Sequence, residues 1–353
     1  MTISPKENLL GVLNGTVFSP LLNEWEAFAP VFGDPVNLYL KAHRQEGQIT
    51  KDRFGAEYIW PKGQLSGMPH VTKDNKVIPD ITKWRDCLKV PDLKTACSAG
   101  WEEIRARKSE IEAGGRKLSL GIMVTGLFEQ LHALMGFEDC LMNFIRRPAE
   151  MLELCEVLGE YRLGFAKFLV ENLKPDAILS HDDWGTKHQL FMNPKTFRKF
   201  IKPQYMKLYG YLKDNGVIVI HHSDSYGESI VPDMIEMGID IWQGALPEND
   251  IVGIIDQYGQ DIAIMGGIDA SIVDRIDSSE EEIRAEVRRA CREYGRNSHF
   301  IPCMTYGGPN FYLFPHVQQY VRDEIDKFNQ EIICGTGEAS HRGSTLAGAP
   351  LQR

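Results

Sequence analysis

From about residue 115 onward, short apolar runs alternate with longer amphipathic stretches. This alternation is typical of βα units, in which each strand of a parallel sheet is followed by a helix that covers it. The pattern predicts an α/β fold, a single (β/α)8 TIM-type barrel with an N-terminal helical and loop extension. The predicted strands are 118–124, 177–180, 217–220, 239–242, 262–265 and 299–302, and the predicted helices are 148–173, 194–215, 228–237, 278–294 and 315–333.

The length of the chain favours one large domain. With 353 residues, of which 43% are hydrophobic, it can bury the core of a whole barrel. Residues 1–115 are rich in Pro, Gly and aromatic residues, and we expect them to form an extension and cover leading into the barrel. We assign 116–334 to the main part of the barrel. Residues 335–353 are small and polar, which predicts a disordered tail.

Charge and hydropathy exclude several classes of function. The net charge of −10 argues against a nucleic-acid partner, because binding to a phosphate backbone draws on clustered Lys and Arg. The sequence has no apolar run long enough for a membrane span, and residues 1–10 lack the apolar centre of a signal peptide. We therefore expect a cytoplasmic protein without a membrane partner. Its seven cysteines form no CxxC pair, which fits reduced thiols, one of them a possible metal ligand.

Polar or Gly-rich sequence follows each of the six predicted strands. In a barrel these ends meet on one face, where barrel enzymes build their active sites. Polar residues that simply end a strand would explain one such junction, but they explain six poorly. We therefore expect the functional site at the C-terminal ends of the strands.

A pair of potential metal ligands ends the run 217–224. Residues alternate between the two faces of a strand, so His222 and Asp224 share one side. Imidazole and carboxylate are both good ligands for zinc, and a third ligand must come from elsewhere. Cys303, at the end of the last predicted strand, is the natural candidate. The alternative is a hydrogen-bonded His-Asp pair and an inert buried cysteine.

A second cluster of titratable groups lies at 180–185. His181, Asp182 and Asp183 are candidate catalytic groups, because adjacent like charges usually raise the pKa of one carboxyl group and so provide an acid or base. The alternative for either carboxylate is helix capping or salt bridging. Trp184 is a candidate for substrate binding, although it could instead pack in the core.

Three further residues are candidates for substrate binding. Glu129 lies at a predicted strand-to-helix junction, where a carboxylate is favoured by the helix dipole and is more often structural. Tyr306 precedes two glycines that would let the backbone approach a ligand, although Gly-Gly is equally a plain turn. Phe311 follows in the same segment and could face an aromatic ring.

Several motifs, by their order and spacing, resemble the uroporphyrinogen decarboxylase superfamily, and within it the corrinoid-dependent methyltransferases of the O-demethylase type. These are 126–129 with 134–136, 182–185 with 193–194 and 197–203, and 237–240. His222-x-Asp224 followed by Cys303 is similar to the zinc site of those methyltransferases. Their common pattern is His-x-Cys with a distant Cys. Asp224 departs from it by replacing a soft thiolate ligand with a hard carboxylate oxygen.

The resemblance implies a zinc-dependent methyltransferase that moves a methyl group from a small methylated substrate to the cobalt of a corrinoid protein. The sequence contains no corrinoid-binding motif of the Asp-x-His-x-x-Gly kind, so the cobalamin or other corrinoid would be carried by a partner protein. We favour an aryl methyl ether as substrate, since the harder site suits oxygen and aromatic residues (Trp184, Tyr306, Phe311, Tyr312) could face a ring.

Three alternatives stay open. The first is methyl transfer from the corrinoid to a thiol. The ligand set His/Asp/Cys carries the same formal charge as His/Cys/Cys, so charge cannot decide the direction of transfer. Uroporphyrinogen decarboxylase activity is disfavoured, because that family carries an Arg-rich motif near its N-terminus. Here the first arginine is Arg44, and the only lysines before it are Lys6 and Lys41. A catalytically silent barrel that only binds a ligand would show neither bound metal nor methyl transfer.

Overall fold

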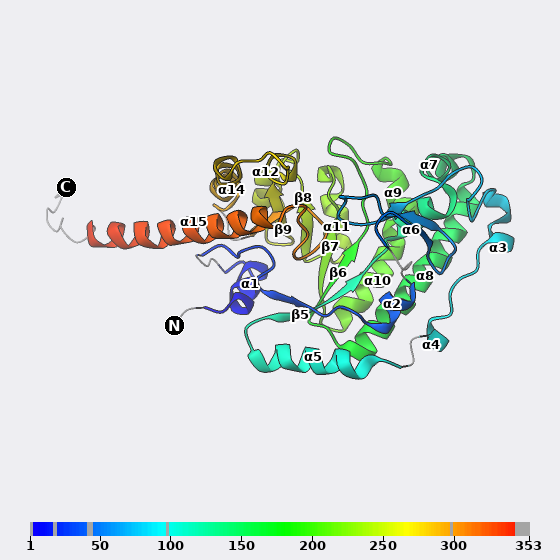
Figure 1. The fold of residues 1–353 in the computed structure, drawn as a ribbon, viewed down its shortest axis with the longest axis horizontal. Helices are drawn as coiled ribbons and strands as arrows, with labels where there is room; N and C mark the ends of the chain where they lie inside the picture. Colours follow the sequence, from blue (N-terminus) through cyan, green and yellow to red (C-terminus); the bar gives the residue numbers. More distant parts are fainter. Residues whose placement is uncertain (1–2, 17–19, 41–44, 97–98, 297–298, 343–353) are drawn as a thin grey trace, which may run out of the picture.

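The protein is built around a curled sheet of seven parallel strands (Figure 1). The computed structural model describes residues 3–16, 20–40, 45–96, 99–296 and 299–342. The predicted α/β class and parallel sheet are confirmed, and all six predicted strands are present. The strands run in the order β1 (Phe28–Pro30), β5 (Leu118–Met123), β6 (Ala177–His181), β7 (Ile218–His222), β8 (Ile241–Ala245), β9 (Ala263–Ile268) and β10 (Phe300–Met304).

The sheet has seven strands in the described part of the chain rather than the eight of a complete TIM barrel. Its edges are β1 and β10, and no ladder joins them among the described residues. The segment before β1 reaches across this gap, because the backbone N–H of Glu24 donates to the carbonyl of Pro302 at 3.2 Å. The sheet therefore curls toward a barrel whose seam lies at Glu24.

The inside of the curled sheet is filled by apolar side chains from alternate strand positions. Because side chains alternate along a strand, Leu179, Ile220 and Ile241 face inward while their neighbours face the helices. Leu9 and Val12 of α1 (Pro5–Leu13) join this interior cluster. Backbone contact between Lys6 and Arg116 places α1 beside the start of β5, so the opposite, C-terminal ends of the strands are left for the site.

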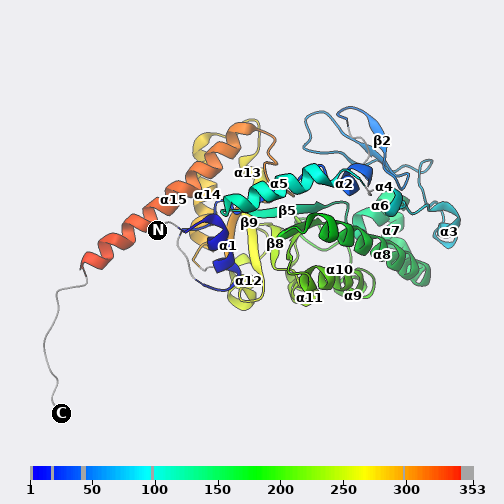
Figure 2. The same ribbon diagram turned by 90° about the horizontal axis from the view of Figure 1, so that it is seen from below.

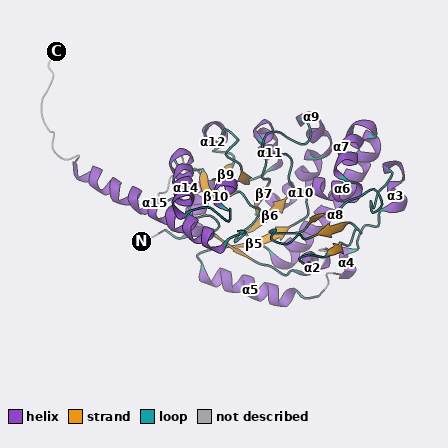
Figure 3. Ribbon diagram, turned by 45° about the horizontal axis from the view of Figure 1, so that its top comes forward, coloured by secondary structure: helices purple, strands orange, loops and turns teal. Residues whose placement is uncertain are grey.

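Helices cover the outer face of the sheet (Figure 3). The longest helix packed on it is α8 (Pro148–Leu173), which begins with a proline at its first position, where the missing N–H costs nothing. α8 packs against α10 (Lys202–Asp214). The others are α2 (Pro35–Leu40), α3 (Trp84–Cys87), α4 (Leu93–Ala96), α5 (Trp101–Gly114), α6 (Leu127–Met135), α7 (Phe137–Arg146), α9 (Pro194–Phe200), α11 (Val231–Met237), α12 (Ile251–Tyr258), α13 (Ala270–Val273) and α14 (Glu280–Tyr294), with short 3-10 turns at Ile81–Lys83 and Glu228–Ile230.

The N-terminal part of the chain adds a small antiparallel sheet of β2 (Ile49–Lys51), β3 (Glu57–Ile59) and β4 (Met68–Pro69). Tyr58 of β3 packs against Ala133 of α6, so this sheet covers the side of the molecule near β5. The same part of the chain also supplies β1, so it is more than a cover.

The last helix, α15 (Pro315–Arg342), holds the N-terminal segment in place. Arg322 donates to the carboxylate of Glu24 at 3.0 Å, and the Asn329 side chain exchanges hydrogen bonds with the backbone of Leu21 at 2.9 Å each way. The helix then projects away from the rest of the molecule (Figure 2). It continues through 335–342, within the segment expected to be a tail, and the remainder of that segment, 343–353, lies outside the described residues.

No helix of the described chain has both the length and the apolar character needed to cross a membrane.

We predict that the interior of the sheet dominates stability. Leu120 is fully buried and Leu38 is 68% exposed. Leu120→Ala should lower the free energy of unfolding by about 2 to 5 kcal/mol, because it removes buried methyl groups and leaves a cavity. The matched change Leu38→Ala should shift it by no more than about 0.5 kcal/mol. Urea titration followed by circular dichroism measures both, and equal losses would contradict this assignment of the core.

Candidate metal and active site

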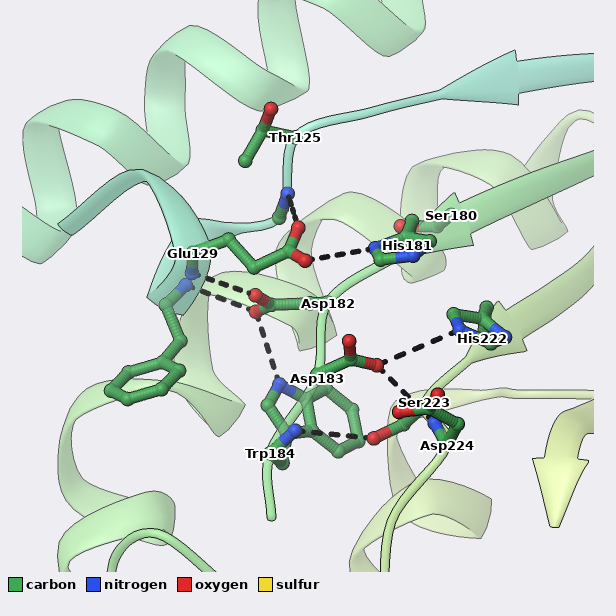
Figure 4. Close-up of polar contacts among 12 residues, drawn as sticks. Thr125, Glu129, Ser180, His181, Asp182, Asp183, Trp184, His222, Ser223 and Asp224 are labelled. Atoms are coloured by element: carbon green, nitrogen blue, oxygen red, sulfur yellow. Dashed lines mark hydrogen bonds and ion pairs between the residues drawn. The ribbon is translucent and has the colours of Figure 1, made fainter. Parts of the chain in front are cut away.

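The site is set by the register of three neighbouring parallel strands. His181 at the end of β6 pairs in register with His222 of β7, and His222 pairs with Gln243 of β8. Side chains at paired positions of adjacent parallel strands point the same way, here into the mouth of the curled sheet. Figure 4 shows the two histidines with the turn that follows β6. These side chains therefore gather at the C-terminal ends of the strands, the face on which the functional site is expected.

His181 forms an ion pair with Glu129 of α6. Its Nδ1 lies 3.0 Å from Oε1 of Glu129, whose other oxygen accepts the N–H of Gly126 at 2.8 Å. Burial alone would lower the pKa of His181, but the charges of Glu129 and Asp183 outweigh it and raise the pKa to about 10. Burial would likewise raise the pKa of Glu129, but His181 holds it at about 2. Without a metal the pair is therefore charged, and a metal would bind Nε2 of His181, which is free of Glu129, only by displacing its proton.

His222 is held in one tautomer by Gln243. The Gln243 amide nitrogen donates to the carbonyls of Met304 and Tyr306, at 3.2 and 3.0 Å, which fixes its oxygen toward His222. That oxygen lies 2.6 Å from Nδ1 of His222, so Nδ1 carries the proton and Nε2 presents a lone pair. Burial, reinforced by the charge of His181, lowers the pKa of His222 to about 3. The ring is therefore neutral, as a metal ligand must be.

Asp183 completes a group of three potential ligands. Its Oδ1 lies 3.6 Å from Nε2 of His222 and accepts the N–H of Asp224 at 3.2 Å. One ligand atom each from His181, Asp183 and His222 lie within 4.8 Å of one another. Burial raises the pKa of Asp183 well above its usual value, although the charge of His181 opposes this.

Gly307 allows the two imidazole rings to lie this close to the backbone that follows β10. The ring centroids of His181 and His222 are 4.4 Å apart. A Cβ atom at position 307 would be 2.8 Å from Cδ2 of His181 and 2.9 Å from Cδ2 of His222, closer than van der Waals contact permits. Glycine at 307 therefore fits a close approach to the site rather than only a turn.

The donor set fits a divalent metal of the zinc type. Two imidazole nitrogens and a carboxylate oxygen are a common three-ligand set that leaves a position open for substrate. Histidines that bind metal usually have their other nitrogen hydrogen-bonded to a carboxylate or carbonyl, which orients the ring. Glu129 does this for His181 and Gln243 does it for His222.

Asp182 faces the other way and anchors the core. Its carboxylate accepts the N–H groups of Phe128 and Glu129, at 3.0 and 2.9 Å, the indole N–H of Trp184 at 3.0 Å and the hydroxyl of Tyr205 at 2.7 Å. It thereby ties the first turn of α6 to the end of β6. A Cβ atom at position 126 would be 2.1 Å from Oδ1 of Asp182, so this contact requires Gly126.

Trp184 packs in the core beside Asp182. Its side chain is 1% exposed, and its ring stacks on that of His221 with centroids 3.9 Å apart. The hydroxyl of Tyr209 lies 2.6 Å from Nδ1 of His221. Neither Trp184 nor His221 therefore lies with the ligand group, although His221 directly precedes His222.

The structure does not gather all three of the ligands predicted from sequence. His222 belongs to the group above, and Asp224 is linked to it through its N–H bond to Asp183. The thiol of Cys303 lies instead in the interior cluster, 4.0 Å from the carboxylate of Glu24. Burial, together with the negative charge of Glu24, raises the pKa of this thiol well above its usual value.

Tyr306 and Phe311 lie in the segment that follows β10. Tyr306 is partly buried, and its backbone carbonyl accepts the bond from Gln243. The Phe311 ring is 37% exposed. Substrate binding by these two aromatic residues stays a prediction.

The residues that sequence reasoning missed are those that orient the ligands. Gln243 belongs to the polar sequence that follows a predicted strand and was not singled out, and Glu129 was a candidate for substrate binding rather than for orienting a histidine. The available signal was one of position, because a polar side chain in an otherwise apolar strand faces the mouth in register with His222.

Comparison with known proteins gives the family. Residues 50–309 match the family described as Uroporphyrinogen decarboxylase (URO-D). The chain belongs to this family. A solved structure described as a methyltransferase from Methanosarcina mazei is similar in fold, with a TM-score of 0.59 and 15% sequence identity over 93% of this chain and 99% of the other. Comparison with curated protein sequences gives no significant match.

We predict that Asp182 matters first for stability. Asp182→Asn should lower the free energy of unfolding by about 2 to 4 kcal/mol, because an amide cannot accept from all four donors and leaves buried groups unsatisfied. Asp224→Asn, at a less buried position, should cost less than about 1 kcal/mol. Urea unfolding of the two variants makes the comparison. If Asp182→Asn is as stable as the wild type but loses turnover, Asp182 has the catalytic role expected from the sequence.

Proposed function

We propose that this protein is a metal-dependent methyltransferase that moves a methyl group from a small methylated substrate to the cobalt of a corrinoid protein. The observation that carries the proposal is the group of His181, Asp183 and His222 at the strand ends, with both imidazole rings oriented by hydrogen bonds at Nδ1. The fold of the Methanosarcina mazei methyltransferase supports the same reaction class.

Zinc is the metal we favour, and two ligand sets compete for it. His181, Asp183 and His222 have their ligand atoms close together, whereas the set His222, Asp224 and Cys303 rests on the resemblance in sequence. We favour the first set, because Cys303 is engaged with Glu24 inside the sheet. When bound, the metal would polarise the heteroatom that loses the methyl group and stabilise the departing anion.

The residues around the metal group would orient the ligands and handle protons. Glu129 and Gln243 fix the two imidazole rings. Burial raises the pKa of Asp224 to about 6, against the opposing charge of His181, so this carboxyl group can exchange a proton near neutral pH. Tyr306 and Phe311, in the segment that follows β10, would supply aromatic surface to the substrate, which suits an aryl methyl ether.

The residues at the mouth disfavour the decarboxylase reaction. The carboxyl groups of Glu129, Asp183 and Asp224 gather there beside His181. A substrate with many carboxylates would need clustered arginines instead. Transfer in the opposite direction, from methylcorrinoid to a thiol, uses the same metal group and is the second candidate within the enzyme class. A silent binding barrel is the alternative outside it.

The ligand sets predict different metal contents. Protein purified with zinc should hold about one ion per chain, and His222→Ala should lose it in either case, since removing one of three ligands abolishes most of the affinity. Asp183→Ala should lose the ion as well if the first set is correct, while Cys303→Ala should keep it. Metal content after dialysis against a weak chelator, measured by elemental analysis, gives the result.

Circular dichroism controls for loss of fold in these variants. A Cys303→Ala protein that has lost its zinc, beside an Asp183→Ala protein that has kept it, would favour the set predicted from sequence. Full zinc in all three variants would place the metal elsewhere and remove the basis of the proposal.

The substrate class can be tested with free reduced cobalamin. Zinc-loaded enzyme, mixed with a panel of methyl ethers, amines and thiols, should convert the reduced cobalamin to its methyl form with an aryl methyl ether such as guaiacol, as followed by absorbance. His222→Ala is the matched control and should reduce the rate by a factor of about 100 or more. An enzyme that is inert on every ether but methylates a thiol from methylcobalamin would reverse the proposed direction of transfer.

A further inference from the structure

A cavity lies outside the curled sheet, between the small N-terminal sheet and α8. It holds about 30 Å³ of space for atom centres. Phe54 and Tyr58 line it from the N-terminal side, Gln130 from α6, and Leu158, Arg162 and Phe165 from α8. Glu129 of α6 contacts His181, whereas its neighbour Gln130 lines this cavity, and none of His181, Asp183 and His222 is among the lining residues.

Arg162 is the unusual residue of this cavity, because its charge is buried without a counter-ion. The side chain is 6% exposed. Its terminal nitrogens donate to the carbonyl of Thr125 and, at 3.4 Å, to the hydroxyl of Ser180, while Nε has no partner among the described residues. No carboxylate of the described chain lies within ion-pair distance of it. Buried guanidinium groups are normally paired, since an unpaired buried charge costs several kcal/mol.

The acidic residues near Arg162 do not neutralise it. Burial raises the pKa of Asp182 and the charge of Arg162 opposes this rise. The Asp182 carboxylate, however, already accepts hydrogen bonds from four other donors. Asp52, which also lines the cavity, accepts the N–H of Ala56 at 2.9 Å and thereby closes its own turn. Burial raises the pKa of Asp52, and the side chain of Gln130 is a further hydrogen-bond partner of this carboxyl group. Arg162 thus has no carboxylate of its own in the described lining of the cavity.

We propose that this cavity binds a small monocarboxylate, whose carboxylate pairs with Arg162 and whose short hydrocarbon part contacts Phe54 and Phe165. A guanidinium matches a carboxylate in shape as well as charge, because its N–H groups can donate in parallel to both oxygens. The space suits a ligand of a few atoms, since about 10 to 15 Å³ of such volume is enough for one water molecule. The cavity is not lined by His181, Asp183 or His222, so this proposal does not rest on the proposed function.

Acetate is the probe, and acetamide is its uncharged control of similar shape. Saturation-transfer NMR on the purified protein should show contact to the acetate methyl group and little to that of acetamide. Arg162→Gln should weaken acetate binding on the order of tenfold or more, as expected for the loss of a hydrogen-bonded charge. Leu158→Phe, which fills the cavity, should also weaken it, whereas the matched change Leu152→Phe on the same helix, away from the cavity lining, should not.

His222→Ala separates this site from the mouth, because carboxylates also bind metals. The acetate signal should persist in His222→Ala, and its loss there would assign the ligand to the metal group and overturn the proposal. Equal binding of acetate and acetamide would overturn it as well. If Arg162→Gln fails to fold, Leu158→Phe decides: unchanged acetate binding in that variant shows that the cavity is not the site.

Discussion

The parallel register of β6, β7 and β8 places His181, His222 and Gln243 side by side, and the rest of the site depends on this row. A shift of one residue in either pairing would turn a histidine from the mouth toward the helices. The register is maintained by the apolar residues beneath the row, Leu179, Ile220 and Ile241, which must stay in the interior cluster. Burial of ordinary aliphatic side chains thus fixes the geometry of the polar ones.

Around this row the protein separates roles between adjacent residues. Asp182 and Asp183 are neighbours, yet one binds four donors in the core and the other lies beside His222. His221 and His222 divide in the same way, with His221 stacked on Trp184 and His222 facing the mouth. The alternation of a strand therefore yields both a support for the site and the site itself from two consecutive side chains.

Much of the fold could be predicted from sequence, because the strands between 118 and 304 are continuous apolar runs and their polar ends mark one face. β1 could not, since Phe28–Pro30 is short and becomes a strand only by pairing with β5. The clustering of His181, Asp183 and His222 was hidden because spacing along the chain does not show which side of the loop after β6 each residue takes. Trp184 and Asp182 are buried on the helix side of the sheet, for packing reasons that no short motif records. Cys303 follows the resemblance in position, but its place in the interior cluster beside Glu24 depends on a contact between residues far apart in the sequence.

The hold of α15 on the N-terminal segment has a consequence for synthesis. The bonds between Leu21 and Asn329 and between Glu24 and Arg322 join residues about 300 positions apart, and they lie where the sheet closes. On the ribosome, the first strand must wait until nearly the whole chain has emerged before its seam can form. Contacts between such distant residues are slow to make, because a long loop must first be closed. The barrel is thus completed from its last helix, and a nascent chain that stops before residue 322 leaves Glu24 without its arginine.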